Sequence, residues 1–182
     1  MKIIKKMIGI LNMKKTLTSA LICSAIALTA ADNLLKNGSF EDMNAKGQLK
    51  AWYPSNGTKV ITDAADGKQA IHLNNSRIAS AQDNVFKPGK YILKLKAKKM
   101  NKAWCGYSFV LRDKDKKQLK AKSLTGYYGM KATNPEWTQF EFQIEIPENC
   151  TGRDYLNLGV QGGNVMIDDV QLIKVEPETA KK

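Results

Sequence analysis

Apolar and polar residues alternate with a period of two along much of the chain, and helical periodicity is almost absent after residue 31. In the segment 91–97, apolar side chains at every second position share one face, and lysines take the other. This alternation is typical of a β-strand with one buried face. The segments expected to form strands are 70–73, 91–97, 104–111, 140–146, 156–160 and 165–175.

Turn-forming residues separate these segments. Pro88-Gly89 precedes one strand, Gly162-Gly163 separates the last two, and the charged stretch 112–117 predicts a hairpin tip. Strands with one apolar face must pair into two sheets that bury those faces against each other. The sequence therefore predicts one all-β sandwich domain over residues 32–175, of roughly eight to ten strands.

The first 31 residues follow a different pattern. Lys14-Lys15 precede the apolar stretch 17–28, and the small residues 29–31 follow it. The stretch is too short for a comfortable membrane span, and small residues at its end suit signal peptidase. We expect residues 1–31 to be a signal peptide, with Met13 as an alternative start, and a membrane anchor is the weaker alternative.

This leader predicts a secreted, periplasmic or cell-surface protein whose mature chain has no transmembrane segment. A lipoprotein anchor at Cys23 is less favoured, because Leu21-Ile22 precede that cysteine where a small residue is wanted. The charged tail 176–182 contains Pro177 and is expected to be frayed.

The charge of the chain comes mainly from lysine. The formal net charge is +12, and residues 1–31 hold five lysines and no acids, so a chain from Asp32 carries 12 − 5 = +7. Nucleic-acid sites favour arginine, and the only arginines are Arg77, Arg112 and Arg153, so no nucleic-acid partner is expected. The lysines of 94–99 and 114–122 are first interpreted as solvated faces, and the alternative is attraction to an anionic glycan or cell surface.

Cleavage of the leader would leave two cysteines, Cys105 and Cys150. Export makes a disulfide between them possible, but two spaced cysteines equally fit two buried free thiols. His72 is the only histidine, so no Cys/His metal cluster is expected.

Several short motifs follow one another in a fixed order. They are Asn33-Leu34-Leu35 to Phe40-Glu41, Trp52, Gly67-Lys68-Gln69-Ala70, Pro88-Gly89-Lys90-Tyr91, Trp137–Pro147 and Ile167-Asp168-Asp169-Val170. This series resembles the CenC-like carbohydrate-binding modules of families 4, 9 and 22, from residue 33 to about 175. The resemblance implies a jelly roll with a galactose-binding-like fold, in which the two ends of the domain lie side by side.

The Asp168-Asp169 pair stands in an otherwise apolar strand, where a buried carboxylate must be paired or bound to a metal. The resemblance implies a structural calcium ion between the first and last strands. Its implied ligands are the Ser39 carbonyl, the Glu41 carboxylate, the Gly67 carbonyl and the Asp168 carboxylate. The alternative is hydrogen bonding of both aspartates to backbone or lysines. Strict alternation puts Asp169 on the Ile167 face, so Asp169 is also an option for the inward carboxylate.

Sugars present apolar C–H faces and many hydroxyls, so a binding face needs aromatic platforms and polar side chains. Trp104 lies opposite the apolar face of its strand, and Asn157 and Gln161 share the outward face of a later strand. Tyr127 and Tyr128 lie in an expected loop, where an exposed aromatic pair needs a reason. Ordinary packing or surface roles are the alternatives for all five.

The resemblance adds Gln82, which matches a position that supplies a polar ligand before the Pro-Gly turn. Trp52 and Trp137 match structural tryptophans, and Tyr107 is expected in the core. Carboxylates are present, but nothing marks a catalytic pair of the kind that glycosidases use.

The sequence as a whole predicts a non-catalytic protein that binds a poly- or oligosaccharide and is not itself an enzyme. The resemblance implies a separate glycoside hydrolase or a surface assembly as its partner. The alternatives are an extracellular sandwich that binds protein and, third, a small glycosidase.

Overall fold

The computed structural model describes residues 32–82, 86–99, 103–128, 135–151 and 154–176. The predicted signal peptide and the tail residues 177–182 lie outside the described residues. Within the described ranges, no helix has the length and hydrophobicity of a membrane span.

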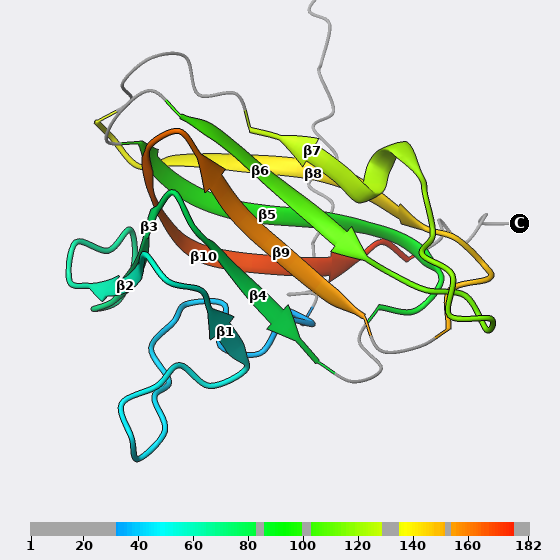
Figure 1. The fold of residues 1–182 in the computed structure, drawn as a ribbon, viewed down its shortest axis with the longest axis horizontal. Coiled ribbons are helices and arrows are strands. Elements are labelled where there is room, and N and C mark those ends of the chain that lie inside the picture. Colours follow the sequence, from blue (N-terminus) through cyan, green and yellow to red (C-terminus); the bar gives the residue numbers. More distant parts are fainter. Residues whose placement is uncertain (1–31, 83–85, 100–102, 129–134, 152–153, 177–182) are drawn as a thin grey trace, which may run out of the picture.

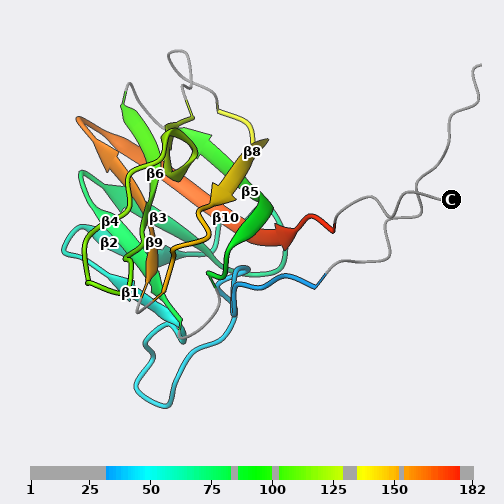
Figure 2. The ribbon, with the colours of Figure 1, turned by 90° about the vertical axis from the view of Figure 1, so that its right-hand side faces the viewer.

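The strands form two five-stranded antiparallel sheets packed face to face, as Figures 1 and 2 show. The sheet nearer the viewer in Figure 1, called the front sheet here, has the order β1-β4-β9-β6-β7. Its strands are β1 (Trp52–Pro54), β4 (Arg77–Ala81), β9 (Tyr155–Gln161), β6 (Trp104–Val110) and β7 (Thr125–Tyr127). One 3-10 turn, η1 (Lys122–Leu124), precedes β7.

The second sheet, called the back sheet, has the order β2-β3-β10-β5-β8. Its strands are β2 (Thr58–Ile61), β3 (Ala70–Asn74), β10 (Asn164–Lys174), β5 (Gly89–Lys99) and β8 (Thr138–Ile146). Every predicted strand segment is present, and the described strand count agrees with the prediction. The predicted all-β jelly-roll sandwich is confirmed.

The core lies between the sheets and contains the side chains that the alternation assigned to it. Inward residues of β5, β6 and β9, among them Leu93, Phe109 and Leu158, are buried. In β8 the inward side chains of Ile144 and Ile146 are buried. Phe140 and Phe142 pack against the edge of the core and are half-buried. The inward faces of both sheets thus form one continuous hydrophobic cluster.

The predicted structural tryptophans are confirmed as such. Trp52 is buried, packs edge-to-face on Phe40, and its Nε1 donates to the Asn37 carbonyl at 2.9 Å. Trp137 is half-buried, and its Nε1 donates to the Asp63 carboxylate at 3.4 Å.

The two ends of the domain are joined side by side, as predicted. Leu34 N donates to the Leu172 carbonyl at 3.0 Å, and Val170 N donates to the Gly38 carbonyl at 2.8 Å. The side chain of Asn33 both donates to the Val170 carbonyl and accepts from Leu172 N. A Cβ on Gly38 would overlap the Val170 carbonyl oxygen, so this close approach requires glycine.

The head segment, residues 33–41, runs as turns and bends rather than as the first strand that the resemblance implied. Asn37 and Phe40 adopt positive φ angles of 53° and 59°, which a regular strand does not allow. The described chain begins and ends, blue and red in Figure 2, on the side of the back sheet, away from β4, β9 and β6.

Candidate functional site

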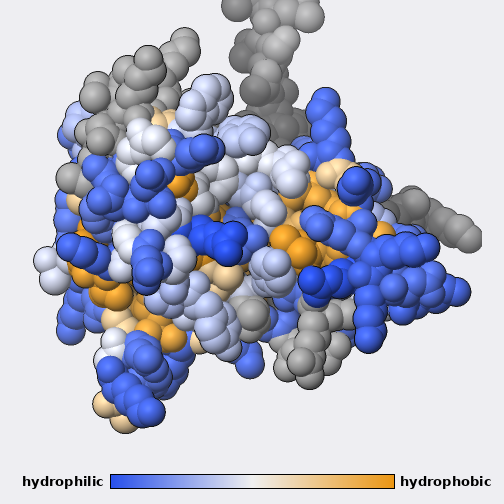
Figure 3. All heavy atoms as spheres, in the orientation of Figure 1, coloured by the Kyte–Doolittle hydropathy of each residue, from blue (hydrophilic) through white to orange (hydrophobic). Residues whose placement is uncertain are grey.

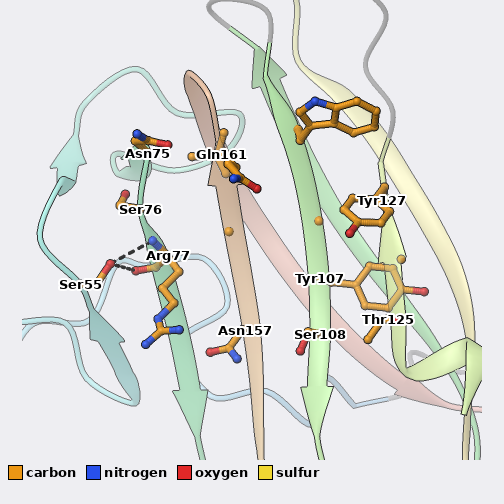
Figure 4. A pocket seen from close by; sticks show the side chains of 15 residues that line it. Ser55, Asn75, Ser76, Arg77, Tyr107, Ser108, Thr125, Tyr127, Asn157 and Gln161 are labelled. Carbon is orange, nitrogen blue, oxygen red and sulfur yellow. Dashed lines mark hydrogen bonds between the residues drawn. The ribbon is translucent and has the colours of Figure 1, made fainter. Parts of the chain in front are cut away.

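A groove of about 520 Å³ lies on the outward face of the front sheet (Figure 4). It runs over β4, β9, β6 and β7, and its lining is polar and aromatic. The lining residues are Ser55, Asn75, Ser76, Arg77, Trp104, Gly106, Tyr107, Ser108, Thr125, Gly126, Tyr127, Asn157, Gly159, Val160 and Gln161. Figure 3 views the same face, where hydrophilic and intermediate residues predominate and hydrophobic residues form smaller separate areas.

The strand register arranges the groove in rows across the sheet. Arg77 pairs with Gly159, Gly159 with Gly106, and Gly106 with Tyr127. The middle row of the groove therefore has an arginine at one end, a tyrosine at the other, and two glycines between them. Because neighbouring strands lie about 4.7–4.9 Å apart, the row spans roughly 14 Å from the first Cα to the last.

The two glycines leave the floor of the groove without side chains. A Cβ on Gly106 would lie 2.9 Å from the Gly126 carbonyl oxygen and 3.2 Å from the Tyr127 ring. A Cβ on Gly159 would meet only ordinary contacts, at 3.5 Å from Arg77 Cβ and 3.7 Å from the Ser76 carbonyl oxygen. Packing therefore excludes a side chain at residue 106. At residue 159 no close contact excludes one, so packing does not explain the glycine there.

Two exposed aromatic rings stand at one end of the groove. Trp104 is 72% exposed and Tyr127 is 73% exposed, although both lie in regular strands. Their ring centroids are 6.2 Å apart and the rings meet edge-to-face at 78°. Large apolar surface left open on strands is typical of a binding face.

Hydrogen-bonding side chains line the rest of the groove. Asn157 pairs with Ser108 in the row next to the glycines, and Gln161 pairs with Trp104 in the row on the other side. The backbone of Arg77 is fixed by Ser55, whose Oγ accepts from Arg77 N at 3.0 Å and donates to the Arg77 carbonyl at 2.9 Å (Figure 4). Such a surface offers apolar platforms and both donors and acceptors within reach of one ligand.

The structure brings together four of the predicted site residues and separates two. Trp104, Tyr127, Asn157 and Gln161 all line the groove. The placement of Tyr128 in a ligand-binding loop is wrong: it is 1% exposed and its ring packs on Phe140 at 5.6 Å. The backbone alternation that turns Tyr127 outward turns its neighbour into the core, where burial raises the pKa of the Tyr128 phenol well above its ordinary value.

Gln82 also lies away from the groove. Its side chain is buried; Nε2 donates to Ser80 Oγ at 2.7 Å, and Oε1 accepts from Lys36 N at 3.1 Å. Gln82 therefore ties the head segment to the end of β4. A ligand has no access to either of its polar atoms.

Sequence reasoning missed Arg77, Ser108 and the glycine floor. The signal for Arg77 was present, because the alternation Arg77-Ile78-Ala79-Ser80-Ala81 places the arginine opposite the buried Ile78. The signal for the glycines was not local, since their effect depends on their meeting across β9 and β6.

Two of the predicted calcium ligands hold one loop from both sides. Glu41 Oε1 accepts from Lys68 N at 2.6 Å and from Gln69 N at 2.8 Å. Asp168 Oδ2 accepts from Ala65 N at 2.8 Å and from Asp66 N at 3.0 Å. The loop of residues 65–69, which contains Gly67, is thus held between the carboxylate of Glu41, near the start of the domain, and the carboxylate of Asp168 in β10.

Both carboxylates accept hydrogen bonds from backbone N–H groups, and for Asp168 such bonding was the alternative to metal binding. Asp168 is fully buried, and desolvation raises the pKa of its carboxyl although three backbone N–H groups favour the charged form. No group of three or more His, Cys, Asp or Glu side chains with metal-binding proximity occurs in the described part of the chain. A calcium ion at this loop would therefore depend on backbone carbonyls, such as those of Ser39 and Gly67, besides the two carboxylates.

Asp169 is not the inward carboxylate. A bulge shifts the register of β10 between Asp168 and Gln171, and Asp169 has a positive φ of 48°. The bulge breaks the strict alternation, so Asp168 points inward and Asp169 points outward to Lys96 Nζ at 3.1 Å.

Three lysines of the back sheet contact carboxylates. Lys94 lies 3.0 Å from Glu141 and Lys98 lies 2.8 Å from Asp63, with the Lys96–Asp169 pair between them. The charges of these three lysines are therefore balanced locally.

Cys105 and Cys150 are both buried and are not bridged to each other, so the structure has the second of the two alternatives for them. Cys150 Sγ contacts Asp154 Oδ2 at 3.4 Å and the Phe86 carbonyl at 3.5 Å. Burial, together with the neighbouring carboxylate, raises the pKa of the Cys150 thiol to about 12.

The fold is similar to that of solved carbohydrate-binding modules. The CBM22-1 xylan-binding domain from Paenibacillus barcinonensis Xyn10C superposes with a TM-score of 0.57 at 19% identity, over 81% of this chain and 97% of that domain. TmCBM61, solved in complex with β-1,4-galactotriose, superposes with a TM-score of 0.54 at 18% identity, over 80% of this chain and all of that one. The fold predicted from the resemblance is therefore confirmed.

Sequence comparison is less informative. No protein-family model matches the chain. The tRNA(Glu)-specific nuclease WapA of Bacillus subtilis subsp. natto is 27% identical over 175 residues, which cover 85% of this chain. The chain spans only 7% of the length of that relative.

Proposed function

We propose that the protein binds a poly- or oligosaccharide non-catalytically in the groove of the front sheet. The observation that carries the proposal is the exposed pair Trp104 and Tyr127 beside a side-chain-free floor lined by amides and hydroxyls. The apolar face of a sugar ring stacks on aromatic side chains, and its hydroxyls exchange hydrogen bonds with amides. The fold shared with xylan- and galactotriose-binding modules supports the same conclusion.

The chemistry of the groove supports binding rather than hydrolysis. Glycosidases use two carboxylates that flank the scissile bond. Among the described residues, the lining of the groove contains no aspartate or glutamate. Sugar hydrolysis in the biological setting would then come from a separate glycoside hydrolase, or the protein would hold the glycan within a surface assembly.

Export and calcium binding are further parts of the proposal. The leader-like residues 1–31 support a secreted, periplasmic or cell-surface location. The proposal keeps the structural calcium ion that the resemblance implies at the loop of residues 65–69, where it would join the two ends of the domain without touching the sugar.

The test is retention on insoluble polysaccharides together with a soluble glycan array. We expect the wild-type protein to be retained and the double variant Trp104→Ala/Tyr127→Ala to pass through. Tyr53→Ala is the matched control, because Tyr53 is 62% exposed on β1 and does not line the groove. Failure of the wild type to bind any glycan would refute the proposal and leave the protein-binding sandwich as the better hypothesis.

A further inference from the structure

Arg77 is a cation on the outward face of the front sheet. It is exposed on the groove and is the one charged residue among the described lining residues. It forms no ion pair within the described part of the chain, whereas Lys94, Lys96 and Lys98 of the back sheet each contact a carboxylate. The groove therefore carries an uncompensated positive charge.

The surroundings of Arg77 leave its guanidinium accessible to a ligand on the floor. Its neighbour across the ladder is Gly159, which has no side chain to cover the arginine stem. Figure 4 shows the Arg77 side chain extending along β4 on the same face as Asn157. The backbone is held by Ser55 on both its N–H and its carbonyl, so the Cα from which the side chain extends is fixed.

The middle row of the groove fixes where a charge on the ligand would lie. Arg77 and Tyr127 are its two ends, with Gly159 and Gly106 between them. The separation of roughly 14 Å exceeds one sugar ring, since it covers three strand intervals. A ligand stacked at Tyr127 would thus reach Arg77 with a different sugar unit.

A guanidinium is suited to a planar or tetrahedral anion. Its N–H groups form two parallel hydrogen bonds to a carboxylate or sulfate, and these charge-assisted bonds are about twice as strong as neutral ones. Sugar hydroxyls do not need a full charge, and Asn157 and Gln161 already offer amides for them.

We propose that the ligand of the groove is an acidic glycan and that Arg77 is the specificity-determining residue that binds its anionic group. This inference rests on the proposed function, and it adds the substrate class. Trp104 and Tyr127 hold the sugar rings, and Arg77 selects chains that carry a carboxylate or sulfate at the spacing of the row.

The experiment compares polymers that share a backbone and differ in charge. Glucuronoxylan is tested against the same polymer after reduction of its carboxyl groups, polygalacturonate against its methyl ester, and dextran sulfate against dextran. Affinity is measured by calorimetry or affinity electrophoresis. We expect at least one acidic polymer to bind about tenfold or more tightly than its neutral counterpart, and the pair in which this occurs separates carboxylate from sulfate recognition.

Charge variants then assign the effect to one residue. Arg77→Gln should abolish the preference by lowering the affinity for the acidic polymer to that for the neutral polymer, and Arg77→Lys should retain part of the preference. Lys94→Gln removes the same charge from the back sheet and should retain the preference. Equal binding of both members of every pair, or equal losses in the Arg77→Gln and Lys94→Gln variants, would overturn the inference while the proposed function stands. Absence of binding to every polymer would refute both.

Discussion

The rings of Trp104 and Tyr127 meet edge-to-face at 78°, with their centroids 6.2 Å apart. Rings set nearly at right angles cannot both lie flat on one sugar face, so one acts as a platform and the other as a wall. We expect Trp104→Ala and Tyr127→Ala each to weaken glycan binding about 3–10-fold, as loss of one aromatic contact does. Isothermal titration with a bound oligosaccharide measures the effect.

Tyr128→Phe is the contrasting variant. The Tyr128 hydroxyl is buried and has no hydrogen-bond partner among the described residues. Its removal should leave binding unchanged and the melting temperature equal or higher, because a buried unsatisfied polar group is unfavourable. A loss of binding in this variant, with the melting temperature kept, would contradict the assignment of Tyr128 to the core.

The glycine floor predicts a separation of binding from stability. Gly159→Ala adds a methyl group at ordinary contact distances, so the fold should tolerate it, while the methyl group should occupy the floor and lower the affinity several-fold. Gly126→Ala would place its Cβ 2.6 Å from the Tyr107 ring and should lower the free energy of unfolding by about 1–3 kcal/mol. Chemical denaturation and titration of both variants give the two quantities. Unchanged affinity in Gly159→Ala would show that the ligand does not reach the floor.

The loop held by Glu41 and Asp168 provides the test of the predicted calcium ion. If the ion binds, excess calcium should raise the melting temperature by several degrees, by mass action on the folded state, and a chelator should reverse the rise. Glu41→Gln keeps an oxygen acceptor for Lys68 N and removes the charge, so it should abolish the calcium response. Asp115→Asn, in the hairpin 112–118, is the control and should keep the response. A melting temperature that does not respond to calcium would contradict the predicted ion. The backbone hydrogen bonds to Glu41 and Asp168 would then hold the loop without a metal.

The burial of Cys105 and Cys150 predicts that their thiols react slowly in the folded protein. Because burial raises the pKa of Cys150 to about 12, the native protein should not react with iodoacetamide at pH 8 at that position. Unfolding without a reductant should allow both Cys105 and Cys150 to be alkylated, which peptide mass spectrometry detects. A cross-linked peptide containing both residues would instead demonstrate the disulfide.

The Asp63–Lys98 pair predicts a pH dependence of known sign. The hydrogen bond from Lys98, with its charge, holds the pKa of Asp63 below its ordinary value of 3.8. The contribution to stability is therefore present above the unfolded-state pKa and is lost as the pH falls through the lower folded-state value. Asp63→Asn should lower the free energy of unfolding by about 0.2–1 kcal/mol at pH 7 and by nothing at about pH 2, since the pair is exposed. Urea denaturation at both pH values checks this, and a difference that persists in acid would contradict it.

The sequence was informative where structure is local. The period-two pattern placed Trp104 and Asn157 on outward faces and Phe109 and Leu158 in the core, because alternation needs no knowledge of neighbouring strands. It was wrong for Tyr128, because the sequence predicted a loop there, whereas β7 ends at Tyr127 and its alternation turns the next side chain into the core. It also left Asp169 open as the inward carboxylate, because a bulge adds a residue that no local pattern marks.

The groove could not be predicted from the sequence, because it depends on the register between strands that are distant in the chain. Arg77 and Tyr127 are far apart in the chain and become the ends of one row only through the pairing of β4, β9, β6 and β7. The open floor follows from two glycines that meet across strands, and neither glycine shows this role by itself.

The described chain begins and ends on the side of the back sheet, and this arrangement has a practical consequence. A tether attached at either of these points, whether a resin, a cell envelope or a neighbouring protein, pulls on the layer that does not carry Trp104. The molecule would then be displayed with its aromatic rings directed away from the support, free to capture a long glycan lying parallel to that surface.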